Sequence, residues 1–172
     1  MAASPFVVDI TPLKRQPGVQ RPFDPTLAPP DGMALATAEV RATELGFDLQ
    51  LEVAGEELIA QGTIDIGWTG PCRRCLEDQH EVDAVEVREI FQKVPVEGET
   101  YFLDKDQVDL EPMVREVVLL HLPVAPLCRE DCAGPDPDRY ATSVVSDEEP
   151  DDDGEAPIDP RWAALSELTF DD

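Results

Sequence analysis

The four cysteines of this 172-residue chain stand in two close pairs, which is the arrangement most able to do chemistry. Residues 72–75 read Cys-Arg-Arg-Cys and residues 128–132 read Cys-Arg-Glu-Asp-Cys. Each spacing lets two thiolates hold one ion without strain, and four thiolates at about 2.3 Å form the usual tetrahedral site of structural zinc. The pattern predicts one zinc ion per chain, with the ligands Cys72, Cys75, Cys128 and Cys132.

Two other interpretations of the cysteines stay open. Unmetallated cysteines behave as small buried hydrophobes and could simply pack at loop ends. The other interpretation is thiol redox chemistry, which needs a cysteine with a low pKa, because Arg73 and Arg74 would lower the pKa of a neighbouring thiol. Against it, a redox CxxC motif normally opens a helix in a βαβ unit, whereas a hairpin is expected before Cys72. His80 could replace one cysteine as a ligand, although a lone histidine in a polar stretch is usually only exposed.

Alternating apolar and polar residues predict the strands that position the first pair. The alternation covers residues 33–41, 47–53 and 58–66, with a turn at 54–57, so an antiparallel hairpin leads directly to Cys72. Residues 82–91 and 100–103 are also rich in β-forming side chains. A small antiparallel sheet is therefore expected in the centre of the chain.

A helix is predicted just before the second pair. Apolar residues recur at intervals of three and four from Leu110 to about His121, with Asp109 or Glu111 able to cap and Pro112 tolerated in the first turn. Pro123 ends the helix. A zinc site would then join the end of a strand to the end of a helix.

The chain as a whole is expected to be an α+β protein, a small antiparallel β-sheet domain with one main helix and a disordered acidic C-terminal segment. Four regions are expected from composition and patterning. These are a proline-rich N-terminal strand and arm (1–32), the α+β core with the cysteine site (33–135), an acidic disordered linker (136–158) and a short docking helix (159–172).

Composition excludes several classes of function. The formal charge of −25 repels phosphate backbones at long range and disfavours DNA as a partner. The sequence contains no apolar run that would span a bilayer and no secretory signal, so a cytoplasmic protein without membrane contact is expected. It also contains no triad pattern and no glycine-rich phosphate loop, which favours a non-enzymatic role.

The 13 basic residues are scattered apart from two small groups. Most such residues are solvated counter-charges, but a local group can contact phosphate or an acidic protein. The candidate contact residues for RNA or a protein partner are Lys14, Arg15, Arg21, Arg73 and Arg74.

Several motifs together resemble the YceD family of large ribosomal RNA subunit accumulation proteins. The string at 70–77, Gly-Pro-Cys-Arg-Arg-Cys-Leu-Glu, is similar to the family's C-x-R-C-L element. The stretch at 109–128 resembles its acidic helix followed by L-P-x-x-P-x-C, and 159–168 resembles its D-P-R-x-x-x-L-x-x-L ending. Residues 6–9 and 13–18 are similar to the actinobacterial branch.

The resemblance implies a factor that supports 23S ribosomal RNA during assembly of the large subunit. Its partners would be 23S rRNA, a large-subunit ribosomal protein or an assembly intermediate. Many relatives continue with a G-L-C-x-x-C-G element, whereas Ala133 and Gly134 follow Cys132 here. A thiol redox or zinc-handling protein is the alternative function.

Overall fold

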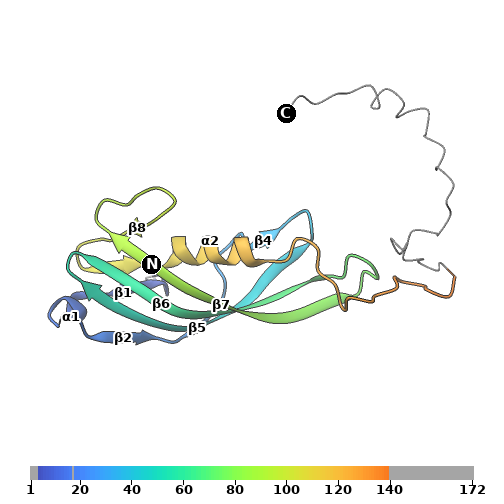
Figure 1. The fold of residues 1–172 in the computed structure, drawn as a ribbon, viewed down its shortest axis with the longest axis horizontal. Coiled ribbons are helices and arrows are strands. Elements are labelled where there is room, and N and C mark those ends of the chain that lie inside the picture. Colours follow the sequence, from blue (N-terminus) through green and yellow to red (C-terminus); the bar gives the residue numbers. More distant parts are fainter. Residues whose placement is uncertain (1–3, 17, 140–172) are drawn as a thin grey trace, which may run out of the picture. The chain divides into compact units, whose positions relative to one another are not determined.

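The computed structural model describes residues 4–16 and 18–139, all within a compact unit that extends from Met1 to Ala141. Three strands of 15 residues each dominate this unit: β5 (Val40–Ala54), β6 (Glu57–Pro71) and β7 (Asp78–Gln92). They pair antiparallel in sequence order, and Figure 1 shows them side by side. Each is more than twice as long as the usual strand of about 5–6 residues.

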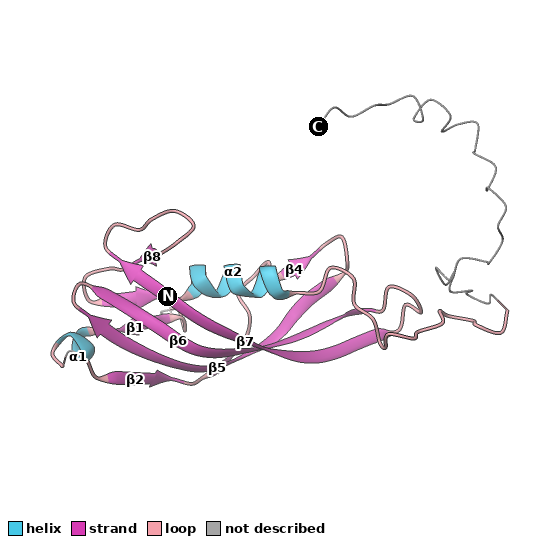
Figure 2. Cartoon of the chain, viewed as in Figure 1, coloured by secondary structure: helices cyan, strands magenta, loops and turns pink. Residues whose placement is uncertain are grey.

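Shorter strands complete the sheet. Three pair antiparallel with β5: β2 (Gln20–Phe23), β3 (Thr26–Leu27) and β4 (Ala34–Leu35). On the other side, β8 (Tyr101–Phe102) pairs in parallel with the end of β7, so the expected antiparallel sheet has one parallel contact. A second, two-stranded sheet joins β1 (Val7–Asp9), which Figure 2 labels, to β9 (Gln107–Asp109).

Alternation of buried and exposed side chains gives the long sheet one face that is covered by the core. Buried side chains recur at every second position from Leu45 to Val53 in β5, and β6 repeats the pattern. Gly62 pairs with Leu49 at a φ of 143°, where a Cβ would overlap the backbone oxygen of Asp48. Only glycine fits this close approach of β5 and β6.

The main helix, α2 (Glu111–His121), lies across the covered face of the sheet (Figure 1). It buries Met113, Val114 and Val118, and Pro112 occupies its first turn, as the sequence predicts. Asp109 accepts a hydrogen bond from the backbone N–H of Glu111 at 2.9 Å. Within the described residues, no helix combines the length and apolar character needed to cross a bilayer.

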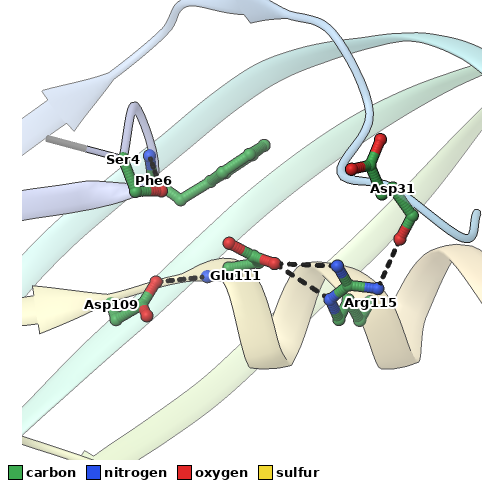
Figure 3. Close-up of polar contacts among 6 residues, drawn as sticks. All are labelled: Ser4, Phe6, Asp31, Asp109, Glu111 and Arg115. Atoms are coloured by element: carbon green, nitrogen blue, oxygen red, sulfur yellow. Dashed lines mark hydrogen bonds and ion pairs between the residues drawn. The ribbon is translucent and has the colours of Figure 1, made fainter. Parts of the chain in front are cut away.

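An arginine on α2 joins the N-terminal region to the helix by a hydrogen bond (Figure 3). The Arg115 guanidinium lies 2.9 Å from the Glu111 carboxylate and donates to the backbone oxygen of Asp31 at 2.8 Å. Phe6 in the same view is buried against Phe47 of β5, with ring centroids 6.2 Å apart. The N-terminal region is therefore part of the packed unit.

Residues 4–16 and 18–32 hold more structure than the strand and extended arm expected for the region 1–32 from the sequence. A short helix, α1 (Thr11–Lys14), follows β1 and buries Leu13, and β2 and β3 then pair with β5. Four residues are too few to show helical periodicity, so no local pattern predicts α1. The linker expected at 136–158 passes out of the described residues after Arg139, and the helix expected at 159–172 lies outside them entirely.

Candidate metal centre

The first cysteine pair lies in the tight turn between β6 and β7. The backbone N–H of Cys72 donates to the oxygen of Glu77 at 2.8 Å, and that of Leu76 donates to the oxygen of Cys72 at 2.9 Å. Leu76 adopts a φ of 64°, which is uncommon for a residue other than glycine. This folded turn directs both sulfurs of the pair to one side.

The second pair follows α2, and the backbone joins it to the first. The helix stops before Pro123, and the chain then passes beside the β6–β7 turn, where the N–H of Arg73 donates to the oxygen of Pro126 at 2.9 Å. The N–H of Cys132 donates to the oxygen of Arg129 at 3.1 Å, which closes a turn between the two cysteines. The strand end and the helix end therefore meet, as the sequence predicts.

The four sulfurs form one cluster. The Sγ atoms of Cys72 and Cys132 are 3.9 Å apart, those of Cys75 and Cys128 are 3.8 Å apart, and all four lie within 4.8 Å of one another. A regular tetrahedron with metal–sulfur bonds of about 2.3 Å has sulfur–sulfur edges of about 3.8 Å. The residues therefore fit a four-thiolate zinc site, and His80 is not part of this group.

The sulfurs differ in protonation when no metal is bound. Hydrogen bonds from backbone N–H groups, those of Cys75 and Cys128 above all, lower the pKa of Cys72 from its ordinary 9.0 to about 6. The neighbouring Cys132 sulfur, followed by burial, raises the pKa of Cys128 to about 12. For Cys75, the Glu77 backbone hydrogen bond lowers the pKa, but burial and the sulfurs of Cys72 and Cys132 outweigh it and the pKa rises.

This pattern disfavours thiol redox chemistry. A reactive cysteine combines a low pKa with access to solvent. Here Cys72, whose pKa is lowered, is fully buried, whereas Cys75 and Cys128 are half-buried and have raised pKa values. All four thiols are free, and their separations exceed by far the disulfide bond length of about 2.05 Å.

The two arginines of the first pair take different positions. Arg74 donates through Nη1 to the backbone oxygens of Glu130 at 2.8 Å and Cys132 at 2.9 Å. It therefore joins the two cysteine segments, a role that sequence reasoning missed because it depends on where the second pair folds. Arg73 instead lines a groove of about 550 Å³ beside the cysteines, together with the exposed apolar side chains of Leu76 and Val124.

The basic residues singled out in the sequence do not form one surface. Lys14 ends α1, Arg15 follows it, and Arg21 donates to the backbone oxygen of Asp9. Arg21 pairs with Leu51 of β5, which in turn pairs with Ala60 of β6. Ala60 is eleven residues before the end of β6, next to the first cysteine pair. At about 3.3 Å per residue, Arg21 is therefore roughly 36 Å along the sheet from that pair. The structure thus divides the set into a group on the N-terminal segment and a pair at the cysteines.

The fold and the cluster define a class of protein, an acidic α+β protein in which two cysteine pairs join the end of a long sheet to the segment after its main helix. The chain belongs to the YceD family, because residues 60–169 match the family described as Large ribosomal RNA subunit accumulation protein YceD. The resemblance seen in the sequence motifs is therefore confirmed.

Relatives extend over most of the chain. An uncharacterized protein of Mycobacterium tuberculosis is 32% identical over 174 residues, which cover 96% of this chain and 82% of the relative. An uncharacterized protein of Mycobacterium leprae is 33% identical over 181 residues, with 98% and 80% covered. The uncharacterized protein YlbN of Bacillus subtilis is 27% identical over 140 residues, with 78% and 72% covered. No solved structure matches the chain.

Proposed function

We propose that this protein is a non-enzymatic factor that supports the accumulation of 23S ribosomal RNA during assembly of the large subunit, and that its four cysteines hold one zinc ion. The family description names large ribosomal RNA subunit accumulation, which supports the first part. The second part, the zinc ion, is supported by the cluster of four cysteine sulfurs that lie within 4.8 Å of one another. Cys72, Cys75, Cys128 and Cys132 are the ligands in this proposal.

The zinc ion would act as a structural clamp. A four-thiolate site has no open coordination position, so bound zinc would supply folding energy in place of Lewis-acid chemistry. The backbone hydrogen bond between Arg73 and Pro126 and those from the Arg74 side chain already align the two segments. The clamp would fix the surface that these segments present.

The groove beside the clamp is the proposed contact surface. Leu76 and Val124 are 70% and 78% exposed, and Arg73 adds a cation that no ion pair within the described residues neutralises. Apolar side chains around an arginine suit a ribosomal protein or a single-stranded RNA segment. Arg73 is the main contact residue in this proposal, and Lys14, Arg15 and Arg21 form a separate second contact.

The test joins metal content to ribosomal RNA levels. Protein purified without chelator should contain one zinc per chain, and Cys72→Ser should lose it, whereas Leu76→Ser, in the same turn, should keep it. In cells that depend on the variant, Cys72→Ser should lower the ratio of 23S to 16S rRNA. Metal-free wild-type protein with reactive thiols would instead favour the redox or zinc-handling alternative.

A charge reversal tests the contact surface separately. Arg73→Glu should keep zinc but weaken association with large-subunit precursors, while Lys93→Glu, at the other end of the strands, should leave association unchanged. If Arg73→Glu has no effect on precursor association, the groove is not the contact surface.

A further inference from the structure

The outer edge of β7 is open over most of its length. β6 pairs with β7 from Asp78 to Phe91, but on the other side β8 pairs only with Phe91 and Gln92. Among residues 4–16 and 18–139, no strand pairs with that side between Asp78 and Ile90. The opposite edge of the sheet, along β5, is by contrast covered by three short strands.

The direction of the free backbone groups follows from two hydrogen bonds. The oxygen of Gln92 accepts from the N–H of Leu103, away from β6, whereas the oxygen of Gln79 accepts from the Thr69 hydroxyl of β6. Backbone groups alternate sides along a strand, and the register between β6 and β7 has no interruption. The even-numbered residues from His80 to Ile90 therefore turn their N–H and C=O groups to the open edge.

The side chains along this edge carry mostly negative charge. From Asp78 to Ile90 there are five acidic residues and one arginine, Arg88. An exposed apolar side chain accompanies them, since Val82 of β7 is 69% exposed. This surface combines unpaired backbone groups, acidic side chains and small apolar contacts.

A small acidic pocket lies where the open edge ends. Glu89 of β7, Glu99 and Glu116 of α2 line a space of about 130 Å³ together with Tyr101, whose hydroxyl donates to Glu116 at 2.8 Å. No ion pair within the described part of the chain neutralises these glutamates. Burial, and then the charge of Glu116, raise the pKa of Glu89.

We propose that the open edge of β7 binds an extended, lysine- or arginine-bearing segment of a partner protein as an added strand, with one cationic side chain in the Glu89–Glu116 pocket. Main-chain hydrogen bonds give the affinity in this mode, and alternate side chains give the specificity. This inference rests on the proposed function only in assigning the segment to a basic ribosomal protein.

Charges on an edge strand can also serve only to prevent aggregation. Protection against aggregation is achieved by short edge strands and by charges of either sign. The open edge of β7 is instead long, almost uniformly acidic and next to an acidic pocket. A second copy of the chain is disfavoured as the occupant because each copy carries a charge of −25. The same field disfavours RNA, which also lacks the peptide groups needed for strand pairing.

The test uses the full-length protein and a synthetic peptide of about ten residues that alternates lysine and valine. A second peptide of equal charge carries an N-methyl group on each of its central residues, so neither of its edges can pair with a strand. Fluorescence anisotropy at physiological salt should show binding of the first peptide about tenfold or more tighter than the second. Equal binding of the two peptides would show a purely electrostatic contact and overturn the proposal.

Variants of the protein locate the contact. Ala84→Pro removes an N–H that faces the open edge and changes no charge, so it should weaken the first peptide about tenfold, whereas Ala84→Thr should not. Glu116→Gln should weaken binding of the first peptide severalfold. This variant does not alter β7, so it still tests the proposal if Ala84→Pro fails to fold. Unchanged affinity in folded Ala84→Pro, or direct binding of labelled oligouridylate to the protein that Ala84→Pro weakens equally, would overturn the proposal.

The outcome is independent of the ribosomal role. Zinc content and the ratio of 23S to 16S rRNA are measured in cells carrying Ala84→Pro and Ala84→Thr. Loss of peptide affinity with unchanged rRNA levels supports the strand site and counts against its use in ribosome assembly. Intact peptide affinity in Ala84→Pro counts against the strand site whatever the rRNA levels are.

Discussion

The two ends of the long strands are held in different ways. At the hairpin end, residues 53–58 and 91, the strands pack into the hydrophobic core, and Phe91 and Leu58 are fully buried. At the cysteine end, residues 68–80, Trp68 and Cys72 are also buried but Leu76 is 70% exposed, and the four cysteines and several backbone hydrogen bonds join the β6–β7 turn to the segment after α2. Apolar burial stabilises the first end, whereas the second combines apolar burial with the cysteine cluster and these hydrogen bonds.

The difference indicates where the protein can vary without unfolding. Burial is spread over many residues, so the hairpin end tolerates the loss of any one contact better than the cysteine end tolerates the loss of one ligand. Changes at the cysteine end should therefore be local and should act on one surface. The following variants test this contrast.

The largest effect is expected from Gly62→Ala, which affects both ends. A Cβ at position 62 would overlap the backbone oxygen of Asp48 and would require an unfavourable positive φ, so the pairing of β5 with β6 must shift. We expect a loss of about 3–5 kcal/mol in the free energy of unfolding, measured with denaturant. Gly55→Ala, also at positive φ but with open space around it, should cost only about 1 kcal/mol.

Removal of one of the proposed zinc ligands should act on the cysteine end alone. A clamp between Cys72 and Cys132 closes a long loop, as a disulfide does, so Cys72→Ser should cost about 2–4 kcal/mol. Amide hydrogen exchange should increase at residues 72–78 and 126–132 but stay slow around Leu58 and Phe91. Equal loss of protection at both ends would contradict the division between them.

The two neighbouring arginines should separate stability from binding. Arg74→Ala removes hydrogen bonds to two backbone oxygens, so it should lower the free energy of unfolding by about 1–3 kcal/mol and weaken retention of the proposed zinc ion against a chelator. Arg73→Ala leaves these contacts in place and should change thermal stability by about 0.5 kcal/mol at most. A similar loss from both variants would show that Arg73 also has a structural role.

A further expected effect is a pH dependence of the metal-free protein. Because the folded pKa of Cys72 is lowered to about 6, its stabilisation is fully present above the ordinary pKa of 9.0 and is lost as pH falls through 6. For Cys128, raised to about 12, stabilisation is present below 9.0 and is lost as pH rises towards 12. Urea unfolding should thus show stability that rises from pH 6 to 9, and Cys72→Ser should lack this rise.

The sequence predicted the elements that have strong local patterns. Alternating apolar and polar residues predicted the hairpin of β5 and β6. Apolar residues at intervals of three and four predicted α2 with bounds almost identical to those observed. The joining of a strand end to a helix end also followed, because each cysteine pair directly succeeds its element. These features depend only on neighbours along the chain.

Other features depend on contacts between distant residues and left no local signal. The pairing of Val7 with Asp109 and the bonds from Arg74 to Glu130 and Cys132 require the folded arrangement. The open edge of β7 also could not be predicted, since alternation marks a strand but not whether a neighbour pairs with it. Among the candidate contacts, spacing along the chain gave no warning that Arg21 and Arg73 lie at different ends of the strands.

The cysteine cluster also has a consequence for the order of events during synthesis. Cys75 and Cys128 are separated by 53 positions, so at about 5–20 residues per second the ribosome makes the second pair roughly 3–10 seconds after the first. Until then the first pair has only two sulfurs to offer. Closure of the cluster therefore comes after α2 has been made, and a metal held there would mark a chain whose sheet and helix are both complete.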